Sequence, residues 1–144
     1  MKFIIEFLCI ILISMIFVSI DLNNYSGECI INLENPQKIY AFIIIVIHHI
    51  IGAISNIGWI FYSKAMLIIF VITIIIILIH WILNGNRCFI TQKLNKFCYL
   101  PDDHRFPDFF YIIGLKKYDF WNNWACYLFY SFALVYAVYK IFIL

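Results

Sequence analysis

The chain has 144 residues, enough for one domain, and only 12% of them are charged, about half of the roughly 25% typical of soluble domains. Apolar side chains make up 65% of the sequence, so we expect lipid rather than water to surround most of it. The net charge of +2 is spread along the chain, which excludes the concentrated basic surface that nucleic-acid binding requires. Abundant isoleucine, asparagine and lysine suggest an A+T-rich genome, as in some large DNA viruses, protists and Gram-positive bacteria.

The first apolar run covers residues 3–20 and is preceded by Lys2. It is longer than the roughly 7–15 residues of a signal-peptide core and has no pair of small residues at its end, so we expect a retained membrane-spanning helix. Glu6 lies one turn inside this run, where its carboxylate is expected to reach back to lipid headgroups or to Lys2. The polar stretch that follows, residues 21–39, is interpreted as an exposed loop.

Residues 40–62 and 65–83 are two further apolar runs, joined by a tight turn at Tyr62-Ser63-Lys64. Each run has about the 20 residues that a helix needs to cross a bilayer. Lys64 carries the only charge between residues 40 and 83. The pair of runs therefore predicts a transmembrane hairpin.

A fourth span is predicted at residues 124–142. It contains three small residues that suit close helix packing in lipid: Ser131, Ala133 and Ala137. Aromatic residues lie at both of its ends, as is typical of the two membrane interfaces, together with one lysine: Tyr118, Trp121, Trp124, Tyr136, Tyr139 and Lys140.

The segment between the third and fourth spans, residues 84–123, is expected to hold short amphipathic helices on the membrane surface. Residues 91–98 alternate apolar and polar side chains at helical spacing, with Thr91 as N-cap, and residues 108–115 form a second such piece. His104, beside Asp102 and Asp103, is interpreted as part of a solvated loop between them. The sequence thus predicts an all-α polytopic membrane protein, a single domain over residues 1–144 with four transmembrane helices.

Four spans place both termini and Lys64 on one side of the membrane, and residues 21–39 and 84–123 on the other. The charges give two conflicting orientations. Lys2 before the first span and Asp21 after it favour a cytoplasmic N-terminus, whereas the larger number of Lys and Arg residues in the long segment slightly favours a cytoplasmic location for that segment. Three cysteines fall on the side of the long segment, and they can form a disulfide if that side is oxidising: Cys29, Cys88 and Cys98.

The hairpin contains unusual polar residues. His48 is about as far before the turn as His80 is after it, so the two imidazoles are expected at nearly the same depth. A polar stripe accompanies them, flanked by His49: Gly52, Ser55, Asn56, Trp59 and Thr73.

Three interpretations of this stripe are open. The favoured one is that its side chains hydrogen-bond between helices, in which case no cofactor is expected. The second is axial ligation of haem b or another metal by His48 or His49 together with His80, because paired imidazoles at one depth suit such a site. The third is a pocket for a substrate or a lipid headgroup.

Residues 80–95 read HWILNGNRCFITQKLN and resemble a helix end found in a family of small bacterial membrane proteins of unknown function. The hallmark of that family is W-x-C-P-L-T-x-L-E-N. Cys88, Thr91 and Asn95 match its Cys, Thr and Asn, while Phe89 replaces its proline. The resemblance covers about residues 40–115 and implies the architecture without implying an activity.

The same residues also allow a physical interpretation. Asn84 and Gly85 end the preceding helix, because glycine adopts a left-handed conformation readily. Thr91 then begins the next helix, and residues 88–90 form a short apolar plug that re-enters the bundle. Asn84, Asn86 and Asn95 can satisfy backbone groups exposed at this turn.

The chain lacks the common nucleotide-binding, hydrolase and zinc-protease motifs. We therefore expect a small multi-pass membrane protein with a structural, assembly or partner-binding role and no catalytic activity. Its expected partners are the lipid bilayer and other membrane proteins or its own copies. The alternatives are a haem- or metal-binding redox protein and a small transporter or lipid-modifying protein. The membrane is that of a cell, or of a virion if the source is a large DNA virus.

Overall fold

The computed structural model describes residues 1–100 and 124–144, and no strand occurs in these two ranges. The helices in chain order are α1 Lys2–Asp21, η1 Leu22–Ser26, α2 Gly27–Ile31, α3 Asn35–Ile57, η2 Gly58–Ile60, α4 Lys64–Leu83, α5 Phe89–Phe97 and α7 Trp124–Ile143. Within the described ranges, four helices are long and apolar enough to cross a membrane: α1, α3 continued by η2, α4, and α7. The prediction of an all-α polytopic protein is confirmed.

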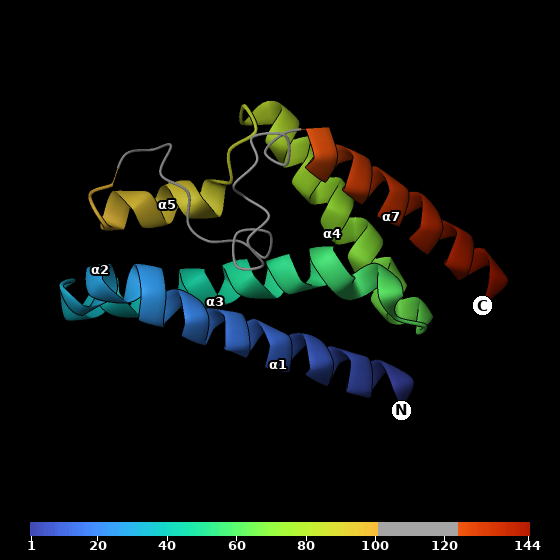
Figure 1. Ribbon diagram of the computed structural model, residues 1–144, viewed down its shortest axis with the longest axis horizontal. Helices are drawn as coiled ribbons and strands as arrows, with labels where there is room; N and C mark the ends of the chain where they lie inside the picture. The colour runs from blue at the N-terminus through green and yellow to red at the C-terminus, as the bar shows by residue number, and fades with distance from the viewer. Residues whose placement is uncertain (101–123) are drawn as a thin grey trace.

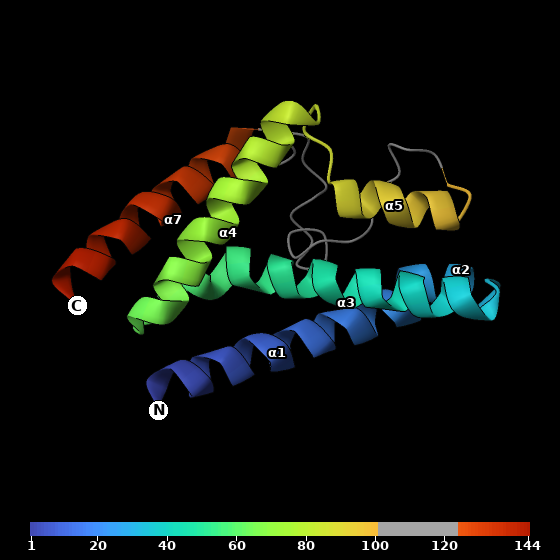
Figure 2. The same ribbon diagram turned by 180° about the vertical axis from the view of Figure 1, so that it is seen from behind.

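The four long helices are arranged as two pairs (Figures 1 and 2). Helix α1 packs along α3, and α4 packs along α7. The pairs meet where α3 passes into α4, and both termini lie at this same end, which we call the turn end. At the opposite end, which we call the loop end, are α2, α5 and the last turn of α4.

The turn between α3 and α4 is short because two residues favour it. Ser63 is the N-cap of α4, and its hydroxyl accepts a hydrogen bond from the Met66 N–H at 3.3 Å. Gly58 lies against Phe70, and a Cβ at this glycine would come within 2.9 Å of the ring. The tight turn predicted at residues 62–64 is therefore confirmed.

Each of the two helix pairs has a hydrophobic core of its own. The core of the α1–α3 pair also includes α2 and α5 and consists of Val18, Ile30, Ala41, Ile44, Ile45 and Leu94. The core between α4 and α7 consists of Leu67, Phe70, Ile74, Tyr130, Ala133 and Ala137. Two of the predicted small residues, Ala133 and Ala137, are thus fully buried, whereas Ser131 is exposed. Small side chains on one face of α7 allow it to approach α4 closely.

Aromatic residues form a cluster within the α4–α7 side. The Trp59 ring lies edge-on to Phe129 and Tyr136, with centroids 6.2 and 5.9 Å away. Nearer the loop end, the Trp81 ring packs against Tyr127 and Tyr130 at 5.8 Å. These rings contact each other between helices, so part of the predicted aromatic belt contributes to packing.

The interpretation of residues 21–39 as an exposed loop is wrong. The chain continues from α1 through η1 into α2, reverses at residues 32–34, and α3 begins at Asn35, five residues before the predicted start. Pro36 is compatible with this early start because the first turn of a helix does not need its N–H. Polarity suggested a loop, but Asp21 and Ser26 are buried here with polar partners.

Helix α5 confirms a helix between the third and fourth spans but corrects its start. It begins at Phe89 with Cys88 as N-cap, rather than at Thr91. Phe89 is 53% exposed, so residues 88–90 do not form an apolar plug, and Ile90 alone of the three packs against the core. The predicted helix at residues 108–115, the loop around His104 and the aromatic residues Tyr118 and Trp121 lie outside the described residues.

Candidate functional site

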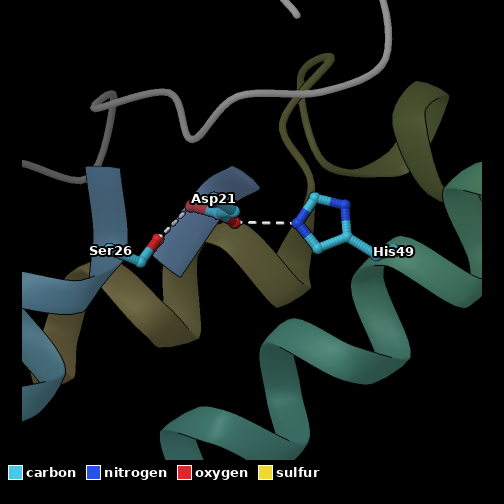
Figure 3. Close-up of polar contacts among 3 residues, drawn as sticks. All are labelled: Asp21, Ser26 and His49. Carbon is cyan, nitrogen blue, oxygen red and sulfur yellow. Dashed lines mark hydrogen bonds and ion pairs between the residues drawn. The ribbon is translucent and has the colours of Figure 1, made fainter. Parts of the chain in front are cut away.

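The last residue of α1 meets the middle of α3 in a buried polar contact (Figure 3). The Asp21 carboxylate lies between two side chains, with its Oδ2 atom 2.8 Å from His49 Nε2 and its Oδ1 atom accepting the Ser26 hydroxyl at 2.5 Å. Asp21 is 2% exposed, His49 4% and Ser26 0%. Both carboxylate oxygens therefore have polar partners in a place that excludes water.

This contact ties three elements together. A carboxylate removed from water is tolerated only when it is paired and hydrogen-bonded, and His49 with Ser26 supplies both kinds of partner. The His49 ring also stacks on Phe17 of α1, with centroids 6.3 Å apart. Asp21 thus joins the end of α1 to α3 and to η1.

A second titratable pair lies nearby, at the start of α5. The Cys88 thiol is half-buried and lies close to the His48 side chain and to Thr91. Burial raises the pKa of the thiol, but the hydrogen bond and charge of His48 and the bonds from Thr91 outweigh it and lower the pKa from 9.0 to about 7. A position at a helix N-terminus also favours a thiolate.

The two pairs are neighbours because His48 and His49 are consecutive. Their rings meet edge to face, with centroids 5.6 Å apart. His48 lies close to the Cys88 thiol, and His49 binds the Asp21 carboxylate. We call Asp21, His48, His49 and Cys88 the loop-end cluster.

His80, the third predicted histidine, forms a hydrogen bond with Phe89, the residue after Cys88. Its Nε2 atom accepts the Phe89 N–H at 3.0 Å. His48 and His80 therefore contact consecutive residues, Cys88 and Phe89, which agrees with the similar depth inferred from their spacing around the turn. No described contact joins the two imidazoles directly.

The end of α4 is shaped by the residues that carried the family resemblance. Gly85 has φ +59° and Asn86 φ +63°, and the Asn86 N–H donates to the Trp81 carbonyl at 2.8 Å, as in a Schellman motif. The Asn84 side chain donates to the Arg87 carbonyl at 2.8 Å and to the Gln92 side chain at 3.0 Å. These bonds link the end of α4 to the start of α5. Asn95 is fully buried within α5.

The predicted polar stripe mostly bonds to its own helices. Ser55 and Asn56 both donate to the Gly52 carbonyl, at 3.0 and 2.7 Å, and Trp59 donates to the Asn56 carbonyl at 2.8 Å. Thr73 donates to the Ile69 carbonyl at 2.8 Å within α4. A contact between helices also occurs: the Asn56 Oδ1 atom accepts the Tyr130 hydroxyl of α7 at 3.4 Å.

A disulfide joins Cys29 of α2 to Cys98 at the end of α5, with their Cα atoms 5.6 Å apart. Cys9, Cys88 and Cys126 keep their thiols. Cys88 and Cys98 flank the same helix, and ten residues at 1.5 Å per residue separate them by roughly 15 Å. The Cys88 thiol is therefore out of reach of the disulfide in its own chain.

At the turn end, two charged residues of the spans, Glu6 and Lys140, bind backbone groups of the turn between α3 and α4. The Glu6 carboxylate accepts the N–H groups of Tyr62 and Ser63, at 2.9 and 3.2 Å, and the Ser63 hydroxyl. The Lys140 ammonium donates to the carbonyls of residues 59, 60 and 61. Glu6 was expected to reach lipid headgroups or Lys2, and the structure places it on the turn.

Within residues 1–100 and 124–144, no three His, Cys, Asp or Glu side chains come together in a group able to hold a metal ion. Each of the three candidate haem ligands instead has a protein partner: His48 contacts Cys88, His49 contacts Asp21, and His80 contacts the Phe89 N–H.

Two members of the loop-end cluster were not recognised from the sequence as members of a site. Asp21 was taken as the first residue of an exposed loop, and Cys88 as part of a structural motif. The available signal was an acidic residue directly after the first span and two histidines in the following span. Comparison of the chain with models of known protein families, with curated proteins and with solved structures finds no match.

Proposed function

We propose that this protein is a structural or assembly component of a membrane that acts by binding partners rather than by catalysis. The observation that carries the proposal is the use of the ionisable side chains in the spans. Glu6 and Lys140 hold the turn between α3 and α4, and Asp21 holds His49. Intramembrane charges in pumps and transporters commonly line a substrate path, whereas these three join one helix to another.

The outward faces of the helices support the same proposal. Large apolar side chains are exposed along α7, and the bilayer or another membrane helix covers such a face: Leu128, Phe132, Val135, Tyr139 and Phe142. The partners proposed are therefore lipid together with other membrane proteins or further copies of this chain.

The disulfide favours one orientation. Bonds such as Cys29–Cys98 persist in oxidising compartments and are rare in the cytosol, so we propose that the loop end faces an oxidising compartment and the turn end the cytoplasm. This orientation agrees with the charges that flank the first span. It is the reverse of the orientation that the Lys and Arg count favours. The membrane proposed is one that borders such a compartment, either in a cell or around a virion.

The redox and transport alternatives have less support. A haem would require an imidazole to exchange its protein partner for iron, and no described contact favours that exchange. The resemblance to the family of small bacterial membrane proteins stays a prediction and concerns architecture alone.

A photo-crosslinking experiment tests the proposed role. A photoreactive amino acid at Phe132, which faces outward, is expected to form adducts of defined mass with a membrane protein or a second copy of the chain in native membranes. The same group at Ala133, which is buried against α4, is the matched control and is expected to crosslink within the chain. Lipid adducts alone at Phe132, with a monomer in mild detergent, would contradict partner binding.

An absorption spectrum of the purified protein tests the redox alternative. A colourless sample, both oxidised and reduced, is expected under the structural proposal. A Soret band that disappears in His80→Ala would replace it by a haem-binding function.

A further inference from the structure

A groove opens at the loop end, between η1 with α2 on one side and the first turns of α3 on the other. Its volume is about 490 Å³, and its lining is mainly apolar, with Lys38 as the one charged residue. Ligand sites in proteins commonly have roughly 300–1,000 Å³, an apolar lining and a few polar groups that set the orientation of the ligand. The groove therefore has the size and the composition of a ligand site.

The polar and apolar parts of the groove follow one another along α3. Lys38 lies nearer the loop end, and Phe42 comes one turn later, roughly 6 Å further towards the middle of the helix. On the facing wall, Asn23 is the one polar side chain, whereas Ile30 and Ile31 of α2 are apolar. A ligand that fits this order has a negatively charged end beside Lys38 and an apolar part beside Phe42.

The membrane contains molecules of this form at the same depth. Helix α3 with η2 covers 26 residues, about six more than a helix needs to cross the hydrocarbon core. A lysine in the first turns of such a span reaches the level of the lipid headgroups, where its ammonium attracts phosphate. Next to Lys38 in the groove, Ile39 is 63% exposed and Phe42 41%, so both side chains are accessible to an acyl chain.

The charge of Lys38 is available for such a phosphate. Its side chain is half-buried, which leaves the methylene stem along the groove and the ammonium at its edge. Within residues 1–100 and 124–144, no carboxylate forms an ion pair with this ammonium, although Glu34 lies one turn earlier on the chain. An anionic headgroup therefore complements a positive charge that no described carboxylate neutralises.

The wall that faces α3 is fixed before a ligand arrives. Gly27 lies so close to Leu22 that a Cβ at this glycine would come within 1.9 Å of the Leu22 carbonyl oxygen. The Cys29–Cys98 disulfide ties α2 to the end of α5. A site that is already ordered loses less conformational entropy on binding, so these links favour a bound ligand.

We propose that this groove binds one phospholipid with an anionic headgroup, whose phosphate lies beside Lys38 and whose acyl chain lies along Ile39 and Phe42. The lipid belongs to the leaflet on the side of the loop end. This inference rests on the membrane location in the proposed function and names a lipid partner for it. It does not depend on a protein partner at α7.

Native mass spectrometry of the full chain, released from detergent micelles, tests the site. Phosphatidylglycerol is the probe, and phosphatidylcholine, which has a phosphate but no net charge, is the matched lipid. We expect one phosphatidylglycerol per chain, bound at least about 5-fold more tightly than phosphatidylcholine, because one lysine beside anionic headgroups changes the binding equilibrium by about this factor. Equal affinities for the two lipids would overturn the proposal.

Substitutions of lysine show whether the preference comes from the groove. Lys38→Gln is expected to remove it, and Lys38→Arg, which keeps the charge, is expected to retain it. Lys96→Gln is the matched control, because Lys96 is an exposed residue of α5 at the same end of the molecule and does not line the groove. An unchanged preference in Lys38→Gln, or an equal loss in Lys96→Gln, overturns the site.

Glycerol phosphate, which lacks acyl chains, separates a lipid site from a site for free phosphate. At the same concentration as the lipid, it is expected to leave phosphatidylglycerol bound. Displacement would show that the acyl chain contributes nothing, and the proposal would fail.

A photoreactive acyl chain on phosphatidylglycerol locates the lipid in the parent chain, so it decides even if Lys38→Gln does not fold. Adducts concentrated in residues 22–42 support the proposal, and adducts spread evenly over the outward faces of α4 and α7 overturn it. Failure here leaves the crosslinking test at Phe132 unaffected, because that test concerns a different helix.

Discussion

The turn end and the loop end hold their charged groups in different ways. At the turn end, Glu6 and Lys140 bind N–H and carbonyl groups of residues 59–63, which do not titrate. At the loop end, Asp21 pairs with His49, and Cys88 lies close to His48, so both partners in each contact are ionisable side chains. A disulfide links elements at the loop end as well.

This difference predicts that the turn end, which we call the fixed end, keeps its contacts when pH or redox potential changes, whereas the loop end does not. Backbone partners keep their hydrogen-bonding capacity at any pH, so the turn end is expected to hold α1, α3, α4 and α7 together between about pH 5 and 8. Imidazoles change charge between about pH 5 and 8, and disulfides change with redox potential. Conditions should therefore alter the loop end first.

The largest expected effect is the loss of the buried carboxylate at the loop end. Asp21→Ala leaves His49 and Ser26 without their partner in a site that water does not reach. We expect the free energy of unfolding to fall by about 3–5 kcal/mol, because breaking a buried pair leaves an uncompensated polar group. Reversible unfolding in mixed detergent micelles measures this change.

A double variant serves as control for this prediction. If the loss comes from the pair, His49→Phe is expected to restore part of the stability of Asp21→Ala, since both polar partners are then gone. A fall of less than about 1 kcal/mol in Asp21→Ala would contradict the assignment of Asp21 as a tie between α1 and α3.

The next effect concerns the disulfide. Cys29→Ser with Cys98→Ser opens a covalent link across 69 residues, and bonds of this kind typically stabilise by about 2–4 kcal/mol. Native-state hydrogen exchange is expected to show faster exchange in α2 and α5, with α4 and α7 unchanged. Equal loss of protection in all helices would mean that the two ends are not independent.

A smaller effect arises from the thiol. Its folded pKa of about 7 lies below the ordinary 9.0, so between these values the unfolded chain binds more protons and stability rises with pH. The contribution is present above about pH 9 and is lost as pH falls through about 7; for a half-buried thiol we expect about 1–2 kcal/mol. Unfolding measured at several pH values checks it, and Cys88→Ala should remove the slope while Cys126→Ala keeps it.

The spans could be predicted from the sequence because length and apolarity determine them. The runs around residues 40–83 match α3, η2 and α4 closely, and Ser63 with Lys64 marks the turn. The start of α3 was misplaced because polar residues before it suggested a loop. Polarity alone does not distinguish a solvated segment from a helix whose polar side chains have buried partners.

The candidate site was predictable only in part. Counting residues from the turn predicted that His48 and His80 lie at one depth. In the structure, His48 of α3 lies close to Cys88 and His80 of α4 binds the Phe89 N–H, both at the start of α5. The partners of the histidines could not be deduced in the same way, because Asp21 reaches His49 only through the packing of α1 on α3. One sequence contains no record of which helix faces meet.

The smallest expected effect tests the fixed end. Glu6→Gln keeps an oxygen that can accept the N–H of Tyr62 or Ser63, so the turn retains much of its hydrogen bonding. We expect a loss of about 1 kcal/mol or less, with no dependence on pH between about 5 and 8, because the backbone partners do not titrate. A pH-dependent loss in this variant would show that Glu6 acts through another titratable side chain. The turn end would then respond to pH as the loop end does, and the distinction between the two ends would fail.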